Sequence, residues 1–356
     1  MNNAPVKQLE STARVIRKEI VKMITKAGSG HPGGSLSATD ILTALYFNVM
    51  RHDPKRPEWE DRDRFILSKG HAAPALYAVL AEAGYYPKEW LSRFSADGSQ
   101  LQKHPDRLLV PGIEISTGAV FLTRRACDQV WVSLAYSDTN VKMMGIEAGL
   151  SSGRNGASHQ AIEDLALMRS MPNMVVMAPL DVVEIGAAVR AAIKHSGPVY
   201  MRMRRHAVPV IFGADCRLEW GKAVTMLEGQ DVGLISTGIM TEETLKAQEM
   251  LAKDGIGAEV LHIHTLKPLD ADAVLRLAQK TGAVVTVENH SVYGGLGSAV
   301  AEILGENLTT PMKRIGILDL FGETGSREYL FEKFKLRAED VAQAAKDVIK
   351  RKGPAA

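Results

Sequence analysis

Four histidines lie in short segments rich in glycine, proline or polar residues, where a ring nitrogen can reach a ligand. They are His31 in GSGHPGG, His71 in SKGHAAP, His104 in QKHPD and His159 in GASHQ. Histidine is the usual proton-transfer side chain near neutral pH, and its N–H also donates to hydroxyl and phosphate groups. One such histidine taken alone is more often a cap or turn residue. Four of them together favour a functional site, because α/β proteins place ligands at loops that follow strands.

Three arginines end the apolar segment PVYMRMRR and form a second group that could bind an anion. Guanidinium groups hold phosphate through paired hydrogen bonds, so Arg202, Arg204 and Arg205 are candidates for that role. A solvated strand end is an equally weighted alternative. The sequence contains no Cys-x-x-Cys, no His-Glu-x-x-His and no Walker loop, which excludes the familiar zinc and P-loop chemistries.

Two glycine-rich segments could approach a ligand closely, but each has a simpler explanation. Gly28, Gly30, Gly33 and Gly34 surround His31 and are more often part of a turn than of an anion-binding nest. The segment GGLG at 294–297 resembles part of a dinucleotide fingerprint, yet Ala299 stands at its sixth position and no acidic residue follows at the proper distance. Tight packing of a helix on a strand is the favoured interpretation there.

Composition narrows the class of protein. The 356 residues include 43 Lys+Arg and 41 Asp+Glu, so charge-driven binding of nucleic acid is not expected. Two cysteines, Cys127 and Cys216, are too few for a disulfide framework and favour a reducing compartment. No apolar run of about 18 residues predicts a membrane span, and residues 1–10 contain no signal-like apolar segment. We therefore expect a cytoplasmic protein with no membrane or nucleic-acid partner.

Hydrophobic periodicity predicts an α/β fold with mostly parallel sheets. Helices are expected over 11–27, 38–50, 72–84 and 158–171, and strands over 64–67, 141–146, 173–178 and 198–204. Residues 206–220 are irregular and indicate a linker. The alternation restarts after it, with strands over 231–238, 258–265, 283–289 and 313–319 and helices over 241–255, 270–282 and 295–306. Such alternation is typical of βαβ units.

Long stretches of the chain closely resemble transketolases. KAGSGHPGGSLSATDIL, RFILSKGHAAPALYAVLAEAGY and VPGIEISTG are similar to their diphosphate-binding domain. GRNGASHQAIEDLALMRSMPNMVVMAPLD and GPVYMRMRR are similar to the second half of their pyrimidine-binding domain, and VENHSVYGGLGSAVAEIL is similar to their C-terminal domain. The resemblance is strongest to bacterial transketolases that are split into two subunits. It implies three-layer, parallel-sheet domains of the thiamine-diphosphate-dependent type.

The resemblance also implies a reaction and the residues that serve it. Transketolases transfer a two-carbon ketol unit between sugar phosphates, using thiamine diphosphate with Mg²⁺ or Ca²⁺. By motif, His31 and His71 would line the thiazolium, diphosphate and substrate region, and His104 and His159 would contact substrate hydroxyls. Further roles would fall on three other residues: Arg205 on the sugar phosphate, Gly118 beside the aminopyrimidine, and Phe121 in the pyrimidine pocket.

The pattern of the family is interrupted between Gly118 and Val120. A diphosphate-domain motif, ISTGA, runs directly into VFLTR, a segment that the family carries deep inside its pyrimidine domain. The intervening family segment supplies the Gly-Asp-Gly metal motif and the glutamate that protonates the cofactor. No convincing replacement occurs in this sequence, so we assign no metal ligands and expect a severely reduced cofactor site.

Two functions remain open on these grounds. One is ketol transfer between sugar phosphates, which would make the chain a transferase of transketolase type. The other is a non-catalytic relative that binds sugar phosphates or serves as a scaffold or partner subunit. The expected organisation is a hybrid domain over 1–205, built from 1–118 and 120–205 with strands 64–67, 141–146, 173–178 and 198–204 in one sheet, a linker at 206–220 and a complete C-terminal domain over 221–350. A homodimer is expected, because half-domains leave apolar faces to be covered.

Overall fold

The computed structural model describes residues 5–67, 70–96, 99–101, 110–112, 119–204 and 208–352, without the side chains of residues 152, 154, 155 and 158. The chain divides after residue 118 into two compact units. No helix in these described ranges is long and apolar enough to cross a membrane.

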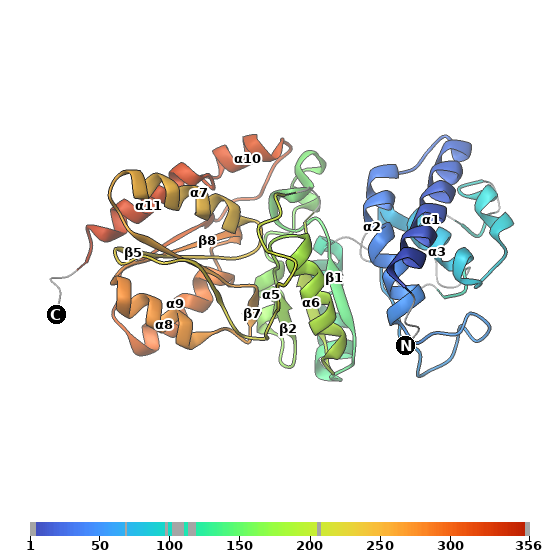
Figure 1. The fold of residues 1–356 in the computed structure, drawn as a ribbon, viewed down its shortest axis with the longest axis horizontal. Coiled ribbons are helices and arrows are strands. Elements are labelled where there is room, and N and C mark those ends of the chain that lie inside the picture. Colours follow the sequence, from blue (N-terminus) through green and yellow to red (C-terminus); the bar gives the residue numbers. More distant parts are fainter. Residues whose placement is uncertain are drawn as a thin grey trace. The chain divides into compact units, whose positions relative to one another are not determined.

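The described residues of the first unit are helical and contain no strand. Three helices, α1 (Val6–Ala27), α2 (Pro32–Ala44) and α3 (Ala73–Ala83), pack on one another, as the blue to cyan part of Figure 1 shows. Shorter turns complete it: η1 (Leu45–Val49), η2 (Gly70–Ala72) and η3 (Lys88–Arg93). The core is formed around α3, whose residues 73–81 are all buried, against Ile16 and Ile20 of α1.

Local sequence signals explain where these helices end and begin. Gly28 and Gly84 take left-handed conformations, with φ of 59° and 92°, directly after α1 and α3, as expected for glycine at that position. The expectation of a turn that includes Gly33 and Gly34 is wrong, because α2 begins at Pro32. Proline suits the first helical position, where its missing N–H has no partner to lose.

The strand expected over 64–67 is absent, and with it the predicted hybrid sheet that included this segment. Residues 63–67 have no regular structure, and Leu67 is buried among the helices of the first unit. A strand needs a neighbour to satisfy its backbone groups, and the described residues of this unit offer none. The short run of apolar residues is thus a core contact and not a strand.

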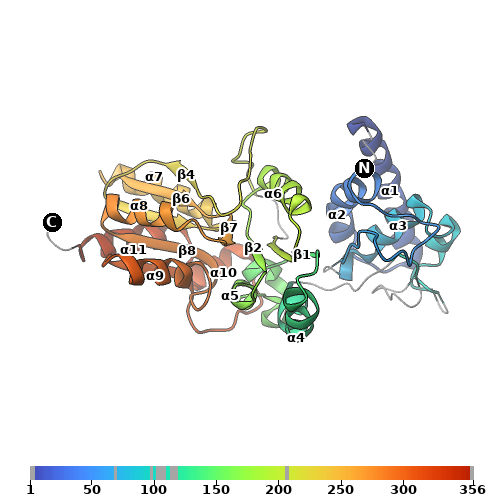
Figure 2. The same ribbon diagram turned by 90° about the horizontal axis from the view of Figure 1, so that it is seen from below.

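The second unit contains two sheets. The four-stranded sheet has the order β1 (Lys142–Gly145), β3 (Val199–Arg202), β2 (Val175–Met177), β7 (Thr265–Lys267). Its first three strands are parallel, whereas β7 joins β2 antiparallel. Helices α4 (Cys127–Val130), α5 (Asp164–Ser170) and α6 (Val182–Lys194) belong to this part, together with η4 (Phe121–Arg125), η5 (Trp131–Tyr136), η6 (Gly149–Asn155) and η7 (Ala157–His159). Figure 2 shows α5 and α6 on either side of these strands.

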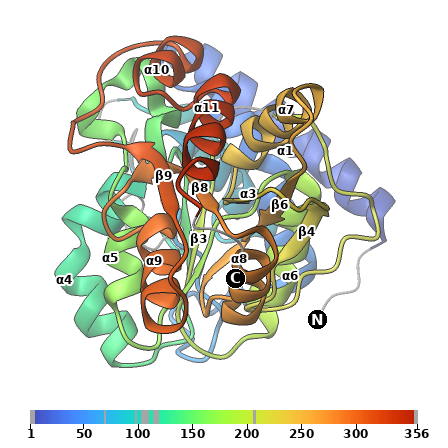
Figure 3. The same cartoon turned by 90° about the vertical axis from the view of Figure 1, so that its left-hand side faces the viewer.

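The five-stranded sheet has the order β4 (Val224–Leu227), β6 (Ala258–His262), β5 (Val232–Ser236), β8 (Val284–Ser291), β9 (Met312–Ile317). It is parallel apart from β4 at one edge. Helices α7 (Met240–Lys253) and α11 (Ala338–Ile349) cover one face, and α8 (Ala271–Thr281) and α9 (Leu296–Asn307) cover the other (Figure 3). The short helix α10 (Arg327–Lys333) precedes α11. This three-layer arrangement confirms the predicted fold class.

The two sheets of the second unit share one hydrophobic core. Leu165 and Met168 of α5 are in the same cluster as Ile235 of β5 and Leu296 of α9, and all four are essentially inaccessible to solvent. Burial on this scale contributes about 1.5–3 kcal/mol for each such side chain. The elements that carry the predicted site residues of this unit are therefore attached to one well-packed core.

Candidate functional site

His31 and His71 form a pair within the first unit. Their ring centroids are 4.5 Å apart and their planes meet at 81°, an edge-to-face arrangement. His31 precedes the first residue of α2, and the Ser35 N–H and hydroxyl donate to its carbonyl at 3.2 and 3.1 Å. His71 lies in the η2 turn before α3. His31 is exposed and His71 half-buried, so the pair lies at the surface of the first unit.

Phe121 and His159 form a second pair, in the second unit. Their ring centroids are 5.2 Å apart at an interplanar angle of 83°. Phe121 is the first residue of η4. Two residues earlier, the Ala119 N–H donates to the carbonyl of Ile146, directly after β1 (3.1 Å). The guanidinium of Arg125 lies over the Phe121 ring, 4.4 Å from its centre. One face of this ring is thus already in contact with a cation.

Gln160, the residue after His159, anchors the histidine loop. It is 1% exposed, and its Nε2 donates to the Glu323 carbonyl at 2.9 Å. The Gly149 N–H donates to the Ala161 carbonyl at 2.7 Å and joins the same loop to η6. His159 therefore projects from a backbone that other segments of the second unit hold in place.

A buried ionic cluster lies directly behind this loop. Asp164 at the start of α5 accepts from the Tyr200 hydroxyl at 2.6 Å and from Arg202 Nε at 2.8 Å. Arg202 Nη2 also donates to the carbonyls of Ala161 (3.2 Å) and Asn289 (2.7 Å). The Asp164 side chain is 0% and that of Arg202 is 8% exposed. Arg202 is committed to this internal pair, so its candidate role as a phosphate ligand is not supported.

Glu288 and His290 on β8 extend the cluster, and burial shifts both pKa values. Burial raises the pKa of Glu288 to about 7, although the Gly297 and Leu296 N–H groups donate to its oxygens and oppose that shift. Burial lowers the pKa of His290 to about 4, against the opposing charge of Asp164. His290 is thus neutral at neutral pH, and its Nδ1 lies 3.7 Å from Glu288 Oε2.

The glycines at 294–297 serve packing, as favoured from the sequence. A Cβ on Gly295 would lie 2.0 Å from Glu288 Oε2, and one on Gly297 would lie 2.8 Å from Arg314 Cδ. The absence of side chains lets the start of α9 close over the buried carboxylate.

Three predicted site residues, His104, Gly118 and Arg205, lie outside the described residues. The other four occur as the two pairs described above, one pair in each unit. Asp164 and Gln160 were missed by sequence reasoning, because both sit in a segment, SHQAIEDLALM, that is typical of a half-exposed helix.

A metal ion bound by the described residues would need ligands grouped among them. These residues contain no group of three or more His, Cys, Asp or Glu side chains that could hold a metal ion, and a diphosphate needs a cation with oxygen ligands in fixed geometry. No chemical step through thiamine diphosphate is derived from this chain alone.

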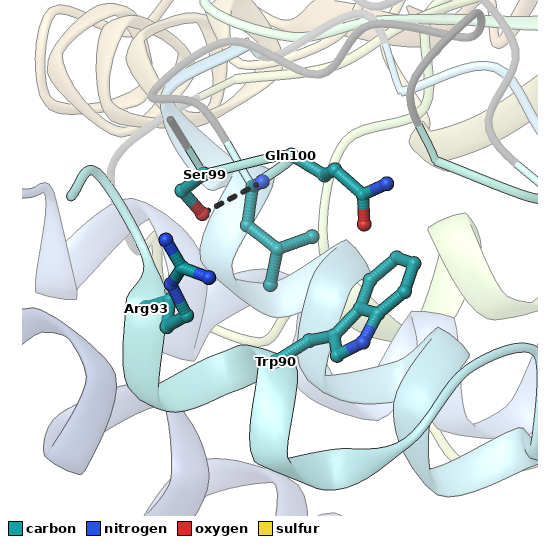
Figure 4. A pocket seen from close by; sticks show the side chains of 5 residues that line it. Trp90, Arg93, Ser99 and Gln100 are labelled. Atoms are coloured by element: carbon teal, nitrogen blue, oxygen red, sulfur yellow. Dashed lines mark hydrogen bonds between the residues drawn. The ribbon is translucent and has the colours of Figure 1, made fainter. Parts of the chain in front are cut away.

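A pocket in the first unit contains none of the predicted site residues. It has a volume of about 300 Å³ and is lined by Trp90, Arg93, Ser99, Gln100 and Leu101. Figure 4 shows Trp90, Gln100 and Arg93 around it, with the Leu101 N–H donating to Ser99 Oγ (3.1 Å). The Trp90 ring stacks on Tyr86 at 5.1 Å, which gives this side chain a structural role.

Three family models match the chain in succession. The transketolase thiamine diphosphate binding domain matches residues 8–141, the transketolase pyrimidine binding domain matches 113–210, and the transketolase C-terminal domain matches 221–341. The first two matches overlap across the interruption seen in the sequence.

Individual proteins are also similar in sequence to the chain. The 6-deoxy-6-sulfo-D-fructose transketolase subunit SqwH of Clostridium sp. (strain MSTE9) is 50% identical over 65% of this chain and 72% of its own length. One of the subunits of the apulose-4-phosphate transketolase of Phocaeicola vulgatus is 36% identical over 65% of this chain and 75% of its own length.

Solved structures also resemble the chain. A split gene transketolase, described as an inactive beta4 tetramer, is 44% identical over 68% of this chain and 77% of its own, with a TM-score of 0.64. A transketolase from Pichia stipitis, at 20% identity and a TM-score of 0.56, shares the fold over 79% of this chain and 37% of its own.

Proposed function

The chain belongs to the transketolase family, and on that premise we propose that it is a substrate-binding subunit for ketol transfer between anionic sugars. Its own histidines would bind the sugar, and a partner chain would supply the metal and diphosphate site. The single observation that carries the first half is the loop of His159, which is held by Gln160 and backed by the Asp164–Arg202 pair. The observation behind the second half is that the described residues lack a metal-ligand group.

The sugar class follows from the named relatives and from the donors in the chain. Relatives are named for 6-deoxy-6-sulfo-D-fructose and for apulose 4-phosphate, and both sugars are ketoses with an anionic end. In this proposal the His159 ring donates to a sugar hydroxyl, and His31 and His71 serve the same purpose in the first unit. The anionic end would be held by Arg205. When bound, thiamine diphosphate supplies the carbon nucleophile of the family's reaction.

The test measures binding and transfer separately. Calorimetric titration of the purified chain with 6-deoxy-6-sulfo-D-fructose and with fructose 6-phosphate reports sugar binding. A transfer assay with the same donors, D-glyceraldehyde 3-phosphate, thiamine diphosphate and Mg²⁺ reports catalysis. We expect saturable sugar binding, and no transfer by the chain alone. If the chain binds neither sugar, the substrate proposal is overturned. Transfer by the chain alone would overturn the dependence on a partner.

A matched pair of histidine variants assigns the binding to the proposed loop. His159→Ala should weaken sugar binding about tenfold, since one or two hydrogen bonds to the ligand are worth about 1–2 kcal/mol. His195→Ala is the control, because His195 is also partly buried in the second unit but contacts Trp220 (5.4 Å) and not the site. Equal weakening in both variants would remove the assignment to His159.

A second candidate function is a wholly non-catalytic scaffold. It would be consistent with the lack of a grouped set of metal ligands among the described residues. It is distinguished by the titration, because a scaffold would bind neither sugar while still assembling with other subunits.

A further inference from the structure

A small cavity in the second unit lies where the end of β3 meets the start of α7. It has a volume of about 20 Å³, and its lining includes Arg204, Asn289, Ser151, Gly238 and Ile239. A cavity of about 10–15 Å³ measured in this way holds one water molecule. The space therefore admits one occupant of the size of a water, a halide ion or a single oxygen atom.

Two hydrogen-bond donors at this cavity are buried and have no partner within the described part of the chain. They are Arg204 Nη1 and Asn289 Nδ2. Asn289 is 1% exposed, and its Oδ1 accepts from the Leu150 N–H at 3.1 Å. That bond fixes the orientation of the amide, since the opposite orientation would place two donors against each other. The unpaired atom of Asn289 is therefore its NH₂ group.

Unpaired buried donors destabilise the folded state, and natural proteins usually satisfy them. Burial lowers the pKa of Arg204 to about 10, while the nearby charges of Asp181 and Glu242 raise it and that of Arg327 lowers it further. Arg204 remains cationic at neutral pH. It thus presents a positive charge to a space that holds only a small group.

The neighbouring carboxylates do not neutralise this charge by direct contact, because both are engaged elsewhere. Asp181 accepts from four backbone N–H groups, those of residues 183, 184, 211 and 212. Glu242 accepts from Lys246 at 2.9 Å and from Arg327 at 3.0 Å.

Helix α7 adds a further positive end. Its N-cap residue is Ile239, and no side chain caps this terminus. A helix of 14 residues carries about half a positive charge at its N-terminus, which favours anions. Gly238 and Ile239, which lead into α7, both line the cavity. A guanidinium and an amide NH₂ thus converge on one small space, beside the first turn of α7, where Glu242 and Glu243 offset part of the helix dipole.

We propose that this cavity binds a compact anion, held by Arg204 and Asn289 at the start of α7. A halide ion fits entirely, whereas an oxyanion such as phosphate would insert one oxygen. The anion would join β3 to α7 and β8, and so to the five-stranded sheet. The proposal does not depend on the sugar-binding role proposed for Arg205.

Thermal unfolding of the full chain without sugar or cofactor tests the proposal. Chloride, bromide or phosphate replaces gluconate at constant ionic strength. We expect the wild-type Tm to rise saturably by about 2–4 °C, as a ligand at roughly ten times its Kd would produce. A rise with halides alone indicates an enclosed halide-sized site, and a rise that includes phosphate indicates insertion of one oxygen.

Arg204→Gln should abolish this rise and should be no less stable than wild type in gluconate, because the described residues offer Nη1 no partner to lose. Arg217→Gln, an exposed arginine on the same unit, is the control and should retain the rise. Crystals grown in bromide should show an anomalous peak beside Arg204. An equal rise in Arg204→Gln, or no rise in wild type, would overturn the proposal and mean that water fills the cavity.

Discussion

Arg202 and Asp164 form an ion pair that is nearly inaccessible to solvent. If one of the two side chains is removed, the other is left buried without its partner. Arg202→Met removes the guanidinium from the buried Asp164 carboxyl, which keeps the Tyr200 hydroxyl as a donor. We expect a loss of about 3–5 kcal/mol in the free energy of unfolding, measured by urea denaturation. Glu302→Gln is the control, since Glu302 is 62% exposed in its pair with Arg169 and should cost under about 1 kcal/mol. A similar loss in both variants would show that burial does not govern this pair.

Glu288 provides a prediction on pH. Its pKa in the folded chain, about 7, lies above the ordinary value of 4.5, so the folded state holds the proton more tightly than the unfolded state. The stability that this proton contributes is full below pH 4.5 and is lost as the pH rises through 7. Glu288→Gln removes this loss.

Measured by urea denaturation, the stability of Glu288→Gln relative to wild type should therefore increase between about pH 5 and pH 8. His290 acts in the opposite direction, because its lowered pKa favours the folded state as the pH rises toward 6.5. The wild-type profile combines both effects, which is why the comparison with Glu288→Gln is needed. A difference that does not vary with pH would contradict the assignment.

Residues that stand in recognisable motifs could be predicted from the sequence, whereas residues paired by tertiary contacts could not. His31, His71, Phe121 and His159 stand in recognisable motifs, and the structure brings them together in two pairs. Asp164 and Arg202 are 38 positions apart and become partners only when α5 packs on the sheet. An acidic residue in an amphipathic pattern is indistinguishable from a solvated one until its tertiary neighbours are known.

Helix α9 offers a test at the scale of an element, through two glycines in one helix. A Cβ on Gly297 would lie 2.8 Å from Arg314 Cδ and 2.9 Å from Thr286 Oγ1, whereas one on Gly305 would meet nothing within 4 Å. Gly297→Ala should therefore cost about 1–3 kcal/mol through overpacking. Gly305→Ala should stabilise by about 0.5–1 kcal/mol, since alanine favours helix. Thermal or urea unfolding of both variants measures this difference, and a stabilised Gly297→Ala would refute it.

The N-terminus of α6 provides a second element-scale prediction. Asp181 accepts from the Val183 and Glu184 N–H groups and from those of Ile211 and Phe212, at 2.6–3.0 Å. Asp181→Ala should cost about 2 kcal/mol or more, because it removes a cap and the attachment of a loop. Ser326→Ala, which removes one cap bond on α10, should cost about 1 kcal/mol and serves as the control. Equal costs would mean that the bonds to residues 211 and 212 contribute nothing.

Elements with strong periodicity could be predicted, and those set by local chemistry or pairing could not. The helix over 72–84 and the strands of the C-terminal block agree with the structure to within a few residues. The start of α2 was missed because glycine and proline normally break helices, and α5 begins at Asp164 instead of 158. Strand β7 was unforeseen because its partner β2 is about 90 residues away.

At the scale of the whole molecule, the expected homodimer and the domain division at 1–205, 206–220 and 221–350 stay predictions. A related split gene transketolase forms a beta4 tetramer. Sedimentation velocity of this chain at several concentrations distinguishes the two assemblies from a monomer. We expect a dimer or a larger even-numbered assembly, and a monomer at all concentrations would contradict both the homodimer and the analogy.

The pairing of strand β7 with β2 limits where a gene for this chain can be divided. It lies after residues 208–220, which form no helix or strand, yet it completes the sheet formed by β1, β3 and β2. A coding sequence cut at that segment would therefore separate β2 from its neighbour and expose a strand edge on each product. Recombination that shuffles family modules should be tolerated poorly at this point, even though the sequence there has the composition of a linker.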